Sequence, residues 1–126
     1  GAPYVATADA GLLDQIASGD MVRGITIACG GFYGPQGRRI RMEIQDPGQN
    51  AKVEAFRYRT DDKGKVREMK VCNFEMESSA LAGLASILGH RAMTCCMVIA
   101  NRHAQEMNTS YKNTIDNLIS LVLERI

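Results

Sequence analysis

The sequence has almost no net charge and no apolar run long enough to cross a membrane. Its 15 basic and 14 acidic residues give a net charge of +1, so the charge balance favours neither nucleic acid nor a membrane surface as a partner. No stretch approaches the roughly 20 apolar residues of a transmembrane helix, and nothing resembles a signal peptide. We therefore expect a cytoplasmic protein that binds neither membranes nor nucleic acids.

The four cysteines follow no pattern that is typical of a metal site. They form no C-x-x-C pair, and Cys95 and Cys96 are adjacent, so in a strand they would point to opposite faces. We expect four reduced, partly buried thiols, and neither a metal nor a cofactor. The chain also lacks a starting Met, and we expect it to be part of a longer polypeptide.

What is present is the ordinary mixture of a small globular domain, with 126 residues of which 45% are apolar and 23% charged. Apolar spacing, β-branched runs and turn residues predict the order of the elements. In the first half we expect a helix capped by Asp9, a strand at 22–29 and a short helix starting at Asp46-Pro47. A hairpin of 56–60 with 65–74, a helix at 78–88 stopped by Gly89 and a central strand at 91–101 should follow. The last expected helix, at 111–125, would bury one apolar face formed by Ile115, Leu118, Ile119 and Val122.

Alternation of strands and helices predicts an α/β fold with a mostly parallel sheet. In such sheets ligands bind where the carboxyl ends of strands meet loops. Two of the expected strands end in unusual polar segments, at 30–38 and 101–102, and a third polar segment at 73–78 precedes the helix at 78–88. These three segments are the candidate site.

Two acids in the third segment have two interpretations. Glu75 and Glu77 are two residues apart and would face the same side of an extended chain. Such a pair could perform acid–base chemistry or accept hydrogen bonds from sugar hydroxyls. Acids at a helix N-terminus also complement the helix dipole without any further role.

The amino-acid sequences of the three segments resemble those of nucleoside phosphorylases of the uridine phosphorylase type. Residues 73–80 read Asn-Phe-Glu-Met-Glu-Ser-Ser-Ala, and residues 32–38 read Phe-Tyr-Gly-Pro-Gln-Gly-Arg, similar to that family's base-binding loop. Residues 99–102, Ile-Ala-Asn-Arg, are similar to its strand end beside the base. All three occur in the family's order, although Gly34-Pro35 reverses an order that is common in bacterial members.

The resemblance implies a role for each residue of the site. Gln36 and Arg38 would read the edge of the uracil, and Phe32 would stack on the base. Met76 would pack beneath the ribose, and Glu77 would accept hydrogen bonds from the ribose hydroxyls. Glu75 would orient this segment close to the sugar. The implied catalytic residues are Arg38 and Arg102, and the implied substrate-binding residues are Phe32, Gln36, Arg38, Glu75, Met76, Glu77 and Ile99.

The same resemblance implies the fold and the reaction. The chain would be the C-terminal half of a single phosphorylase domain, spanning 1–126, within a three-layer sandwich whose central sheet is mixed and mostly parallel. Its reaction, that of a pentosyltransferase, would be phosphorolysis of uridine to uracil and ribose 1-phosphate, with inorganic phosphate as co-substrate. The phosphate site would lie in an N-terminal half outside this chain, and the other implied partners are further subunits of a homo-oligomer.

Two alternatives remain at this stage. A purine nucleoside phosphorylase or nucleosidase of the same superfamily shares the Glu-Met-Glu segment, but it typically places an Asp at the strand end, where this chain has Asn101-Arg102. A non-catalytic nucleoside-binding module is the second alternative. A module that only binds a nucleoside has no physical need for the whole set of candidate site residues, which comprises Phe32, Gln36, Arg38, Met76, Glu77 and Arg102.

Overall fold

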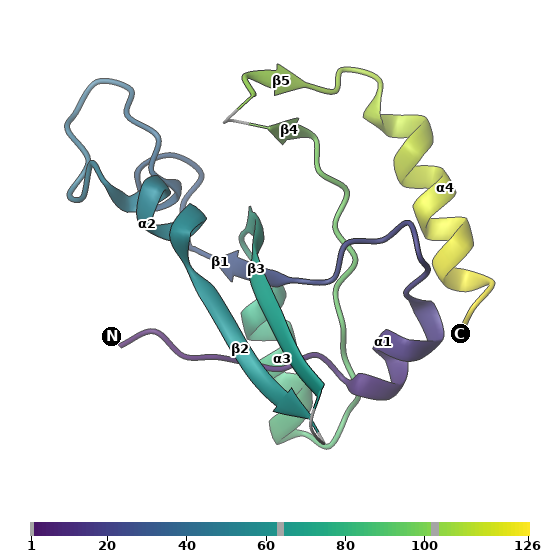
Figure 1. Cartoon of the computed structure of the whole chain (residues 1–126). Coiled ribbons are helices and arrows are strands. Elements are labelled where there is room, and N and C mark those ends of the chain that lie inside the picture. The colour runs from purple at the N-terminus through teal and green to yellow at the C-terminus, as the bar shows by residue number, and fades with distance from the viewer. Residues whose placement is uncertain (1, 63–64, 102–103) are drawn as a thin grey trace.

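The computed structural model describes residues 2–62, 65–101 and 104–126, and these form an α/β arrangement (Figure 1). Helices and strands alternate along most of the chain, which confirms the α/β class. The elements are α1 (Ala10–Ile16), β1 (Ile25–Ala28), the 3₁₀ turn η1 (Gly34–Gln36), α2 (Gln49–Ala55), β2 (Arg57–Asp62), β3 (Lys65–Glu75), α3 (Ser78–Ile87), β4 (Ala100–Asn101), β5 (Glu106–Met107) and α4 (Tyr111–Leu123).

The main sheet is small and mixed, with the strand order β1-β3-β2. β1 pairs in parallel with the second half of β3, so that Ala28 stands opposite Glu75. β2 pairs antiparallel with the first half of β3, from Arg57 opposite Lys70 to Asp62 opposite Lys65. The long strand β3 therefore belongs both to a parallel pair and to the predicted hairpin, and it delivers its carboxyl end beside that of β1.

The predicted central strand at 91–101 is largely wrong. Residues 91–99 run without strand pairing, and only Ala100–Asn101 form a strand, which pairs with β5. The segment still lies beside β3, since the Cys96 thiol is within hydrogen-bonding reach of the Asn73 side chain. An apolar strand needs a ladder of backbone partners. Among the described residues, 91–99 has only isolated backbone hydrogen bonds, from the Asp9 amide to the Ala92 carbonyl and from the Asn108 amide to the Ile99 carbonyl.

The predicted cap of the first helix is confirmed. Asp9 accepts a hydrogen bond from the Leu12 amide at 2.8 Å, and its carboxylate also pairs with Arg91 at 3.1 Å. Asp46-Pro47, in contrast, does not begin α2. Asp46 accepts a hydrogen bond from the Gly48 amide at 3.0 Å, so the two residues form a polar turn ahead of the helix.

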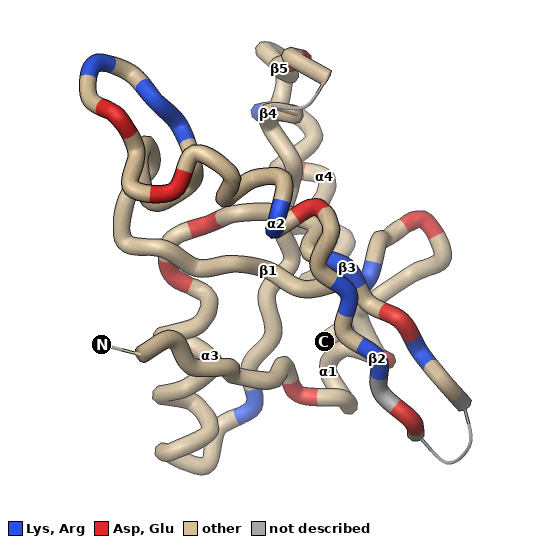
Figure 2. Tube along the Cα trace, turned by 60° about the vertical axis from the view of Figure 1, so that its left-hand side comes forward, with Lys and Arg blue, Asp and Glu red and all other residues tan. Residues whose placement is uncertain are grey.

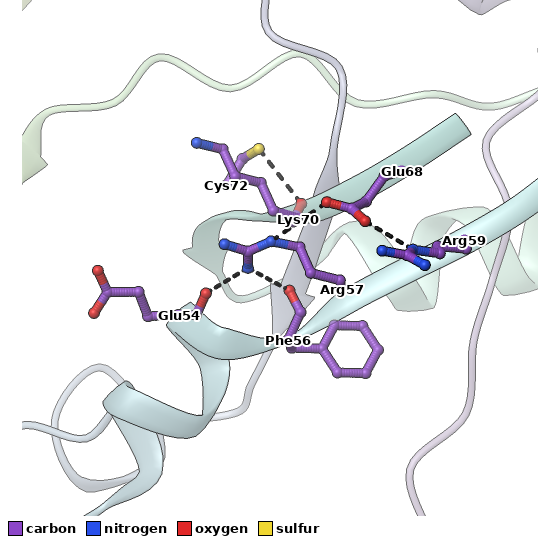
Figure 3. Close-up of polar contacts among 7 residues, drawn as sticks. All are labelled: Glu54, Phe56, Arg57, Arg59, Glu68, Lys70 and Cys72. Carbon is purple, nitrogen blue, oxygen red and sulfur yellow. Dashed lines mark hydrogen bonds and ion pairs between the residues drawn. The ribbon is translucent and has the colours of Figure 1, made fainter. Parts of the chain in front are cut away.

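The hairpin and the end of α2 are joined by a charged cluster (Figure 3). Arg57 donates to the carbonyls of Glu54 and Phe56 at 2.5 and 2.7 Å. Glu68 accepts from Arg59 at 2.8 Å and faces Arg57 at 3.8 Å. Acidic and basic residues both lie along this ribbon (Figure 2). This polar edge is typical of a strand that must remain in solvent without pairing to another chain.

The chain buries little of its apolar surface. Its accessible area is 9964 Å², whereas a compact monomer of 13.8 kDa exposes about 6,600 Å². The only apolar residues that are buried in the described part are Ile16 and Ala85. The prediction that α4 buries its apolar face is wrong, because no residue of α4 is buried.

The open face forms a cleft of about 640 Å³ between α1, α3, residues 91–95 and α4. Leu81 of α3 and Leu118, Ile119 and Val122 of α4 line it. Its walls are mainly apolar, and it lies away from the three polar segments. None of the described helices combines the length and apolarity needed to span a bilayer.

Candidate functional site

The loop that follows β1 is fastened to the end of β3. The Cys29 amide donates to the carbonyl of Glu75 at 3.0 Å, which extends the parallel pairing by one bond. The Tyr33 carbonyl then accepts from the amides of both Gln36 and Arg38, at 3.0 and 2.9 Å. One carbonyl thus sets the backbone positions of both residues that are predicted to read the base.

Gly37 makes this tight turn possible. Its φ is +69°, a left-handed conformation that L residues with a Cβ rarely adopt. A Cβ at this position would overlap the side-chain amide of Asn50. Two side chains of α2 brace the loop from outside, because Gln49 donates to the Pro35 carbonyl at 2.7 Å and Asn50 donates to the Gly37 carbonyl at 3.4 Å.

Arg38 lies against two aromatic rings. Its guanidinium carbon is 4.6 Å from the centroid of the Phe32 ring and 5.2 Å from that of Tyr33. The two rings meet edge to face, with centroids 5.3 Å apart. In the described part of the chain no carboxylate pairs with Arg38, whereas Arg39 pairs with Glu43 at 2.7 Å. A cation held by aromatic faces keeps its N–H groups available for another acceptor.

Gln36 and Phe32 differ in accessibility. Gln36 is only 2% exposed, so it presents almost no surface to solvent. Phe32 is 49% exposed, and much of its ring remains available although Arg38 covers part of it.

Glu75 is fully engaged at the start of α3. Its carboxylate accepts hydrogen bonds from the amides of Glu77 and Ser78, each at 2.7 Å, and from the Ser78 hydroxyl at 2.6 Å. Partial burial raises the pKa of Glu75, but these hydrogen bonds outweigh it and hold the pKa below its usual value. Glu75 is therefore an ionised cap at the start of α3.

Glu77 and Met76 remain open beside that cap. Glu77 precedes α3, and its side chain forms no capping hydrogen bond. Its carboxylate is exposed, and Met76 is 42% exposed. Glu77 can thus offer its oxygens to a ligand without giving up a capping bond.

The sheet brings two of the three segments together. Because Ala28 and Glu75 are paired at the ends of parallel strands, the loop at 29–38 and the segment at 76–78 both leave from one edge. Thr26 fixes this edge by donating to Asn73 at 2.8 Å.

The third segment is less defined. Ile99 is 45% exposed, and its carbonyl accepts from the Asn108 amide at 2.9 Å. No hydrogen bond joins Ile99 to the other two segments in the described part of the chain, and Arg102 lies outside the described residues.

Two residues that hold the candidate site residues in place were given no role by the sequence analysis. Ser78 anchors Glu75, and a Ser three residues after an acid at a helix start is a usable signal for such a cap. Tyr33 supplies both a carbonyl and a ring to Arg38. Nothing in the spacing of these residues indicates that ring contact, because it depends on the left-handed turn at Gly37.

Comparison with known proteins places this arrangement in a family. A family model described as "Phosphorylase superfamily" matches residues 1–125. The chain belongs to the phosphorylase superfamily. Among curated proteins, this phosphorylase segment is similar to a uridine phosphorylase from Thermococcus kodakarensis, with 42% identity over 84 residues. That match covers 66% of the chain and 26% of the relative.

The fold of the phosphorylase segment also matches a solved structure. A nucleoside phosphorylase from Trypanosoma brucei, described as showing uridine phosphorylase activity, superimposes with a TM-score of 0.82 at 24% identity. The superposition covers 95% of this chain and 42% of that one. The chain thus has the nucleoside phosphorylase fold. It spans about a quarter of the length of the matched curated relative and less than half of that of the matched structure.

Proposed function

We propose that this segment supplies the base-binding and ribose-binding residues of a uridine phosphorylase. The reaction converts uridine and inorganic phosphate to uracil and ribose 1-phosphate. The observation that carries the proposal is Arg38, a partly buried cation held over Phe32 and Tyr33 without a carboxylate partner in the described part. Such a cation is suited to an acceptor that becomes negative during the reaction.

The chemistry of the base explains the need for Arg38. When the bond between the anomeric carbon and the base nitrogen breaks, its electron pair moves onto the base and gives the carbonyl oxygens negative charge. N–H donors aimed at such an oxygen stabilise the transition state more than the ground state. In this proposal Gln36, although only 2% exposed in this structure, completes the recognition, because an amide offers a donor and an acceptor to the imide edge. The exposed part of Phe32 stacks on the base.

The ribose lies against the segment at 76–78. Glu77 accepts hydrogen bonds from the ribose hydroxyls, and Met76 packs beneath the sugar. Glu75 orients Glu77 through the cap of α3, as its three hydrogen bonds support. Ile99 and Arg102 remain candidates beside the base, as the resemblance of residues 99–102 implies.

Phosphate binds to another part of a longer polypeptide in this proposal. The large accessible area and the open apolar cleft support a segment that packs against further structure. The missing N-terminal half would complete the three-layer sandwich and give 91–99 its sheet partners. Homo-oligomer contacts would cover further apolar surface. The four free cysteines suit a reducing, cytoplasmic location.

An assay of the complete polypeptide tests the proposal. Uridine and inosine are each supplied with and without phosphate, and release of the free base is measured. We expect phosphate-dependent release of uracil and little hypoxanthine. Release of hypoxanthine instead would assign a purine enzyme, and binding of uridine without release of uracil would assign a binding module.

Arg38 and Arg39 provide a matched pair of variants for this assay. Arg38→Ala removes the proposed donor to the base, and we expect kcat to fall by about 10²- to 10³-fold, the usual effect of losing one such donor. Arg39→Ala breaks only an exposed pair with Glu43, so its activity should stay within about twofold. Equal losses in both variants would contradict the role of Arg38.

A further inference from the structure

The ring of Tyr33 contacts the cation on which the proposed reaction depends. Phe32 and Tyr33 both lie under the Arg38 guanidinium, at 4.6 and 5.2 Å. The proposed function uses Phe32 for the base and leaves the Tyr33 ring without a task. Tyr33 is 50% exposed, so burial of apolar surface does not account for its position.

The backbone and the side chain of Tyr33 act on the same residue. Its carbonyl accepts the amide of Arg38 at 2.9 Å, and its ring faces the guanidinium of that residue at the other end of the side chain. Arginine side chains are flexible and lose rotamer entropy when they are held in one position. Contacts at both ends restrict that freedom before a substrate arrives, and preorganised donors cost less reorganisation during the reaction.

The geometry also leaves the functional part of Arg38 open. In the described part no acid neutralises Arg38, in contrast to Arg59 and Arg91, which pair with carboxylates. An aromatic ring attracts the cation without supplying the oxygen acceptor that a guanidinium N–H would otherwise bind, so N–H donors of Arg38 remain for the base.

We infer that Tyr33 is the positioning residue of Arg38, and that its ring orients the guanidinium toward the leaving base. This inference rests on the proposed function. Both rings contact the guanidinium, but Phe32 also serves the base, whereas the Tyr33 ring serves the arginine alone. The phenol hydroxyl has no part in the contact, so a phenylalanine ring should replace Tyr33.

Kinetics of the complete polypeptide test this role. Tyr33→Leu should lower kcat for uridine by about three- to tenfold with little change in KM, the range expected from one cation–π contact. Tyr33→Phe should retain nearly full activity. In an Arg38→Ala background, Tyr33→Leu should have no further effect, because a positioning residue acts only through its partner. A further loss in that background would overturn the inference.

A change of leaving group gives an independent readout. The fluorine of 5-fluorouridine withdraws electrons and stabilises the departing base, so turnover of this substrate depends less on Arg38. The loss caused by Tyr33→Leu should therefore shrink with 5-fluorouridine. A general disturbance of the loop would lower the turnover of both substrates equally, and that result would contradict the inference.

Nuclear magnetic resonance separates this inference from the proposed function. Ring currents should move the Arg38 Nε–H signal upfield, and that signal is identified by its loss in Arg38→Ala. The shift should persist in Tyr33→Phe and shrink in Tyr33→Leu. If uridine is not cleaved but the shift persists in Tyr33→Phe and shrinks in Tyr33→Leu, the proposed function fails and the positioning of Arg38 stands. An unchanged shift in Tyr33→Leu would overturn the positioning itself.

Discussion

Replacing Glu75 by alanine is expected to loosen the first turn of α3. The carboxylate accepts two amide hydrogen bonds and one hydroxyl hydrogen bond, at 2.6 to 2.7 Å. The amides of Glu77 and Ser78 belong to the unpaired donors that every helix start must satisfy. Alanine offers no acceptor, so both amides would have to turn to water.

The magnitude follows from the number and kind of these bonds. Loss of a capping acceptor costs about 0.5–2 kcal/mol, and the negative charge at the helix start adds about 0.3–1 kcal/mol. Because Glu75 is only partly buried, solvent screens part of its charge, and we expect a total of about 1–2 kcal/mol. That free energy corresponds to a factor of about 5–30 in the local opening equilibrium.

Amide hydrogen exchange of the complete polypeptide measures this opening directly. Protection of the peptide that spans residues 76–80 should fall by about 5- to 30-fold in Glu75→Ala. Ser78→Ala removes only the hydroxyl, and a single hydrogen bond of about 0.5–1.5 kcal/mol corresponds to about two- to tenfold. Glu77→Ala is the control, because that side chain caps nothing.

The pH dependence has a definite sign. The pKa of Glu75 is lowered in the folded chain, so its ionised form stabilises the helix start at every pH above the ordinary pKa of a glutamate. The stabilisation is lost as the pH falls through the lowered value. Protection of residues 76–80 should thus be constant near neutral pH and decline only under acid conditions, with no such decline in Glu75→Ala. Unchanged protection in Glu75→Ala, or a larger loss in Glu77→Ala, would refute the cap.

Two glycine substitutions test the backbone around the site. Gly37→Ala should lower uridine turnover at least tenfold, since its φ of +69° and the Asn50 side chain leave no room for a Cβ; kinetics of the complete polypeptide check this. Gly24→Ala should lower the thermal midpoint by several degrees, since its Cβ would overlap the Cys72 sulfur and lie 2.9 Å from the Lys70 carbonyl oxygen. Gly19→Ala, with nothing within 4 Å, is the control for both, and an equal effect there would contradict both predictions.

The elements that sequence patterns predicted well are those with local causes. The Asp9 cap and the stop of α3 at Gly89 with its φ of +75° are both set by residues a few positions apart. Turn chemistry and helix caps act within such distances. The spacing of apolar residues likewise placed α3 and α4 within two residues of their observed ends.

The failures concern elements that depend on distant partners. Residues 91–99 have the composition of a central strand, yet strand pairing requires backbone donors and acceptors from another segment. The apolar face of α4 has the right spacing for burial, but it lines an open cleft. A sequence pattern shows that a helix face or a strand edge is suited to packing. It does not show whether the same chain provides the segment that packs against it.

The candidate site shows the same division. The motif at 73–78 was recognisable, and its resemblance implied that Glu77 binds the ribose while Glu75 orients the segment. The sequence did not reveal the hydrogen bonds by which Glu75 caps α3, which include the one from the Ser78 hydroxyl. The contact between Tyr33 and Arg38 depends on a turn through Gly37, and only the three-dimensional arrangement reveals it.

The most direct test of the central proposal is ³¹P nuclear magnetic resonance of the complete polypeptide with uridine and phosphate. The proposed reaction predicts that the phosphate signal declines while a ribose 1-phosphate signal grows in step with released uracil. Release of uracil with an unchanged phosphate signal would show hydrolysis and contradict phosphorolysis. No release of uracil at all would contradict the assignment to uridine.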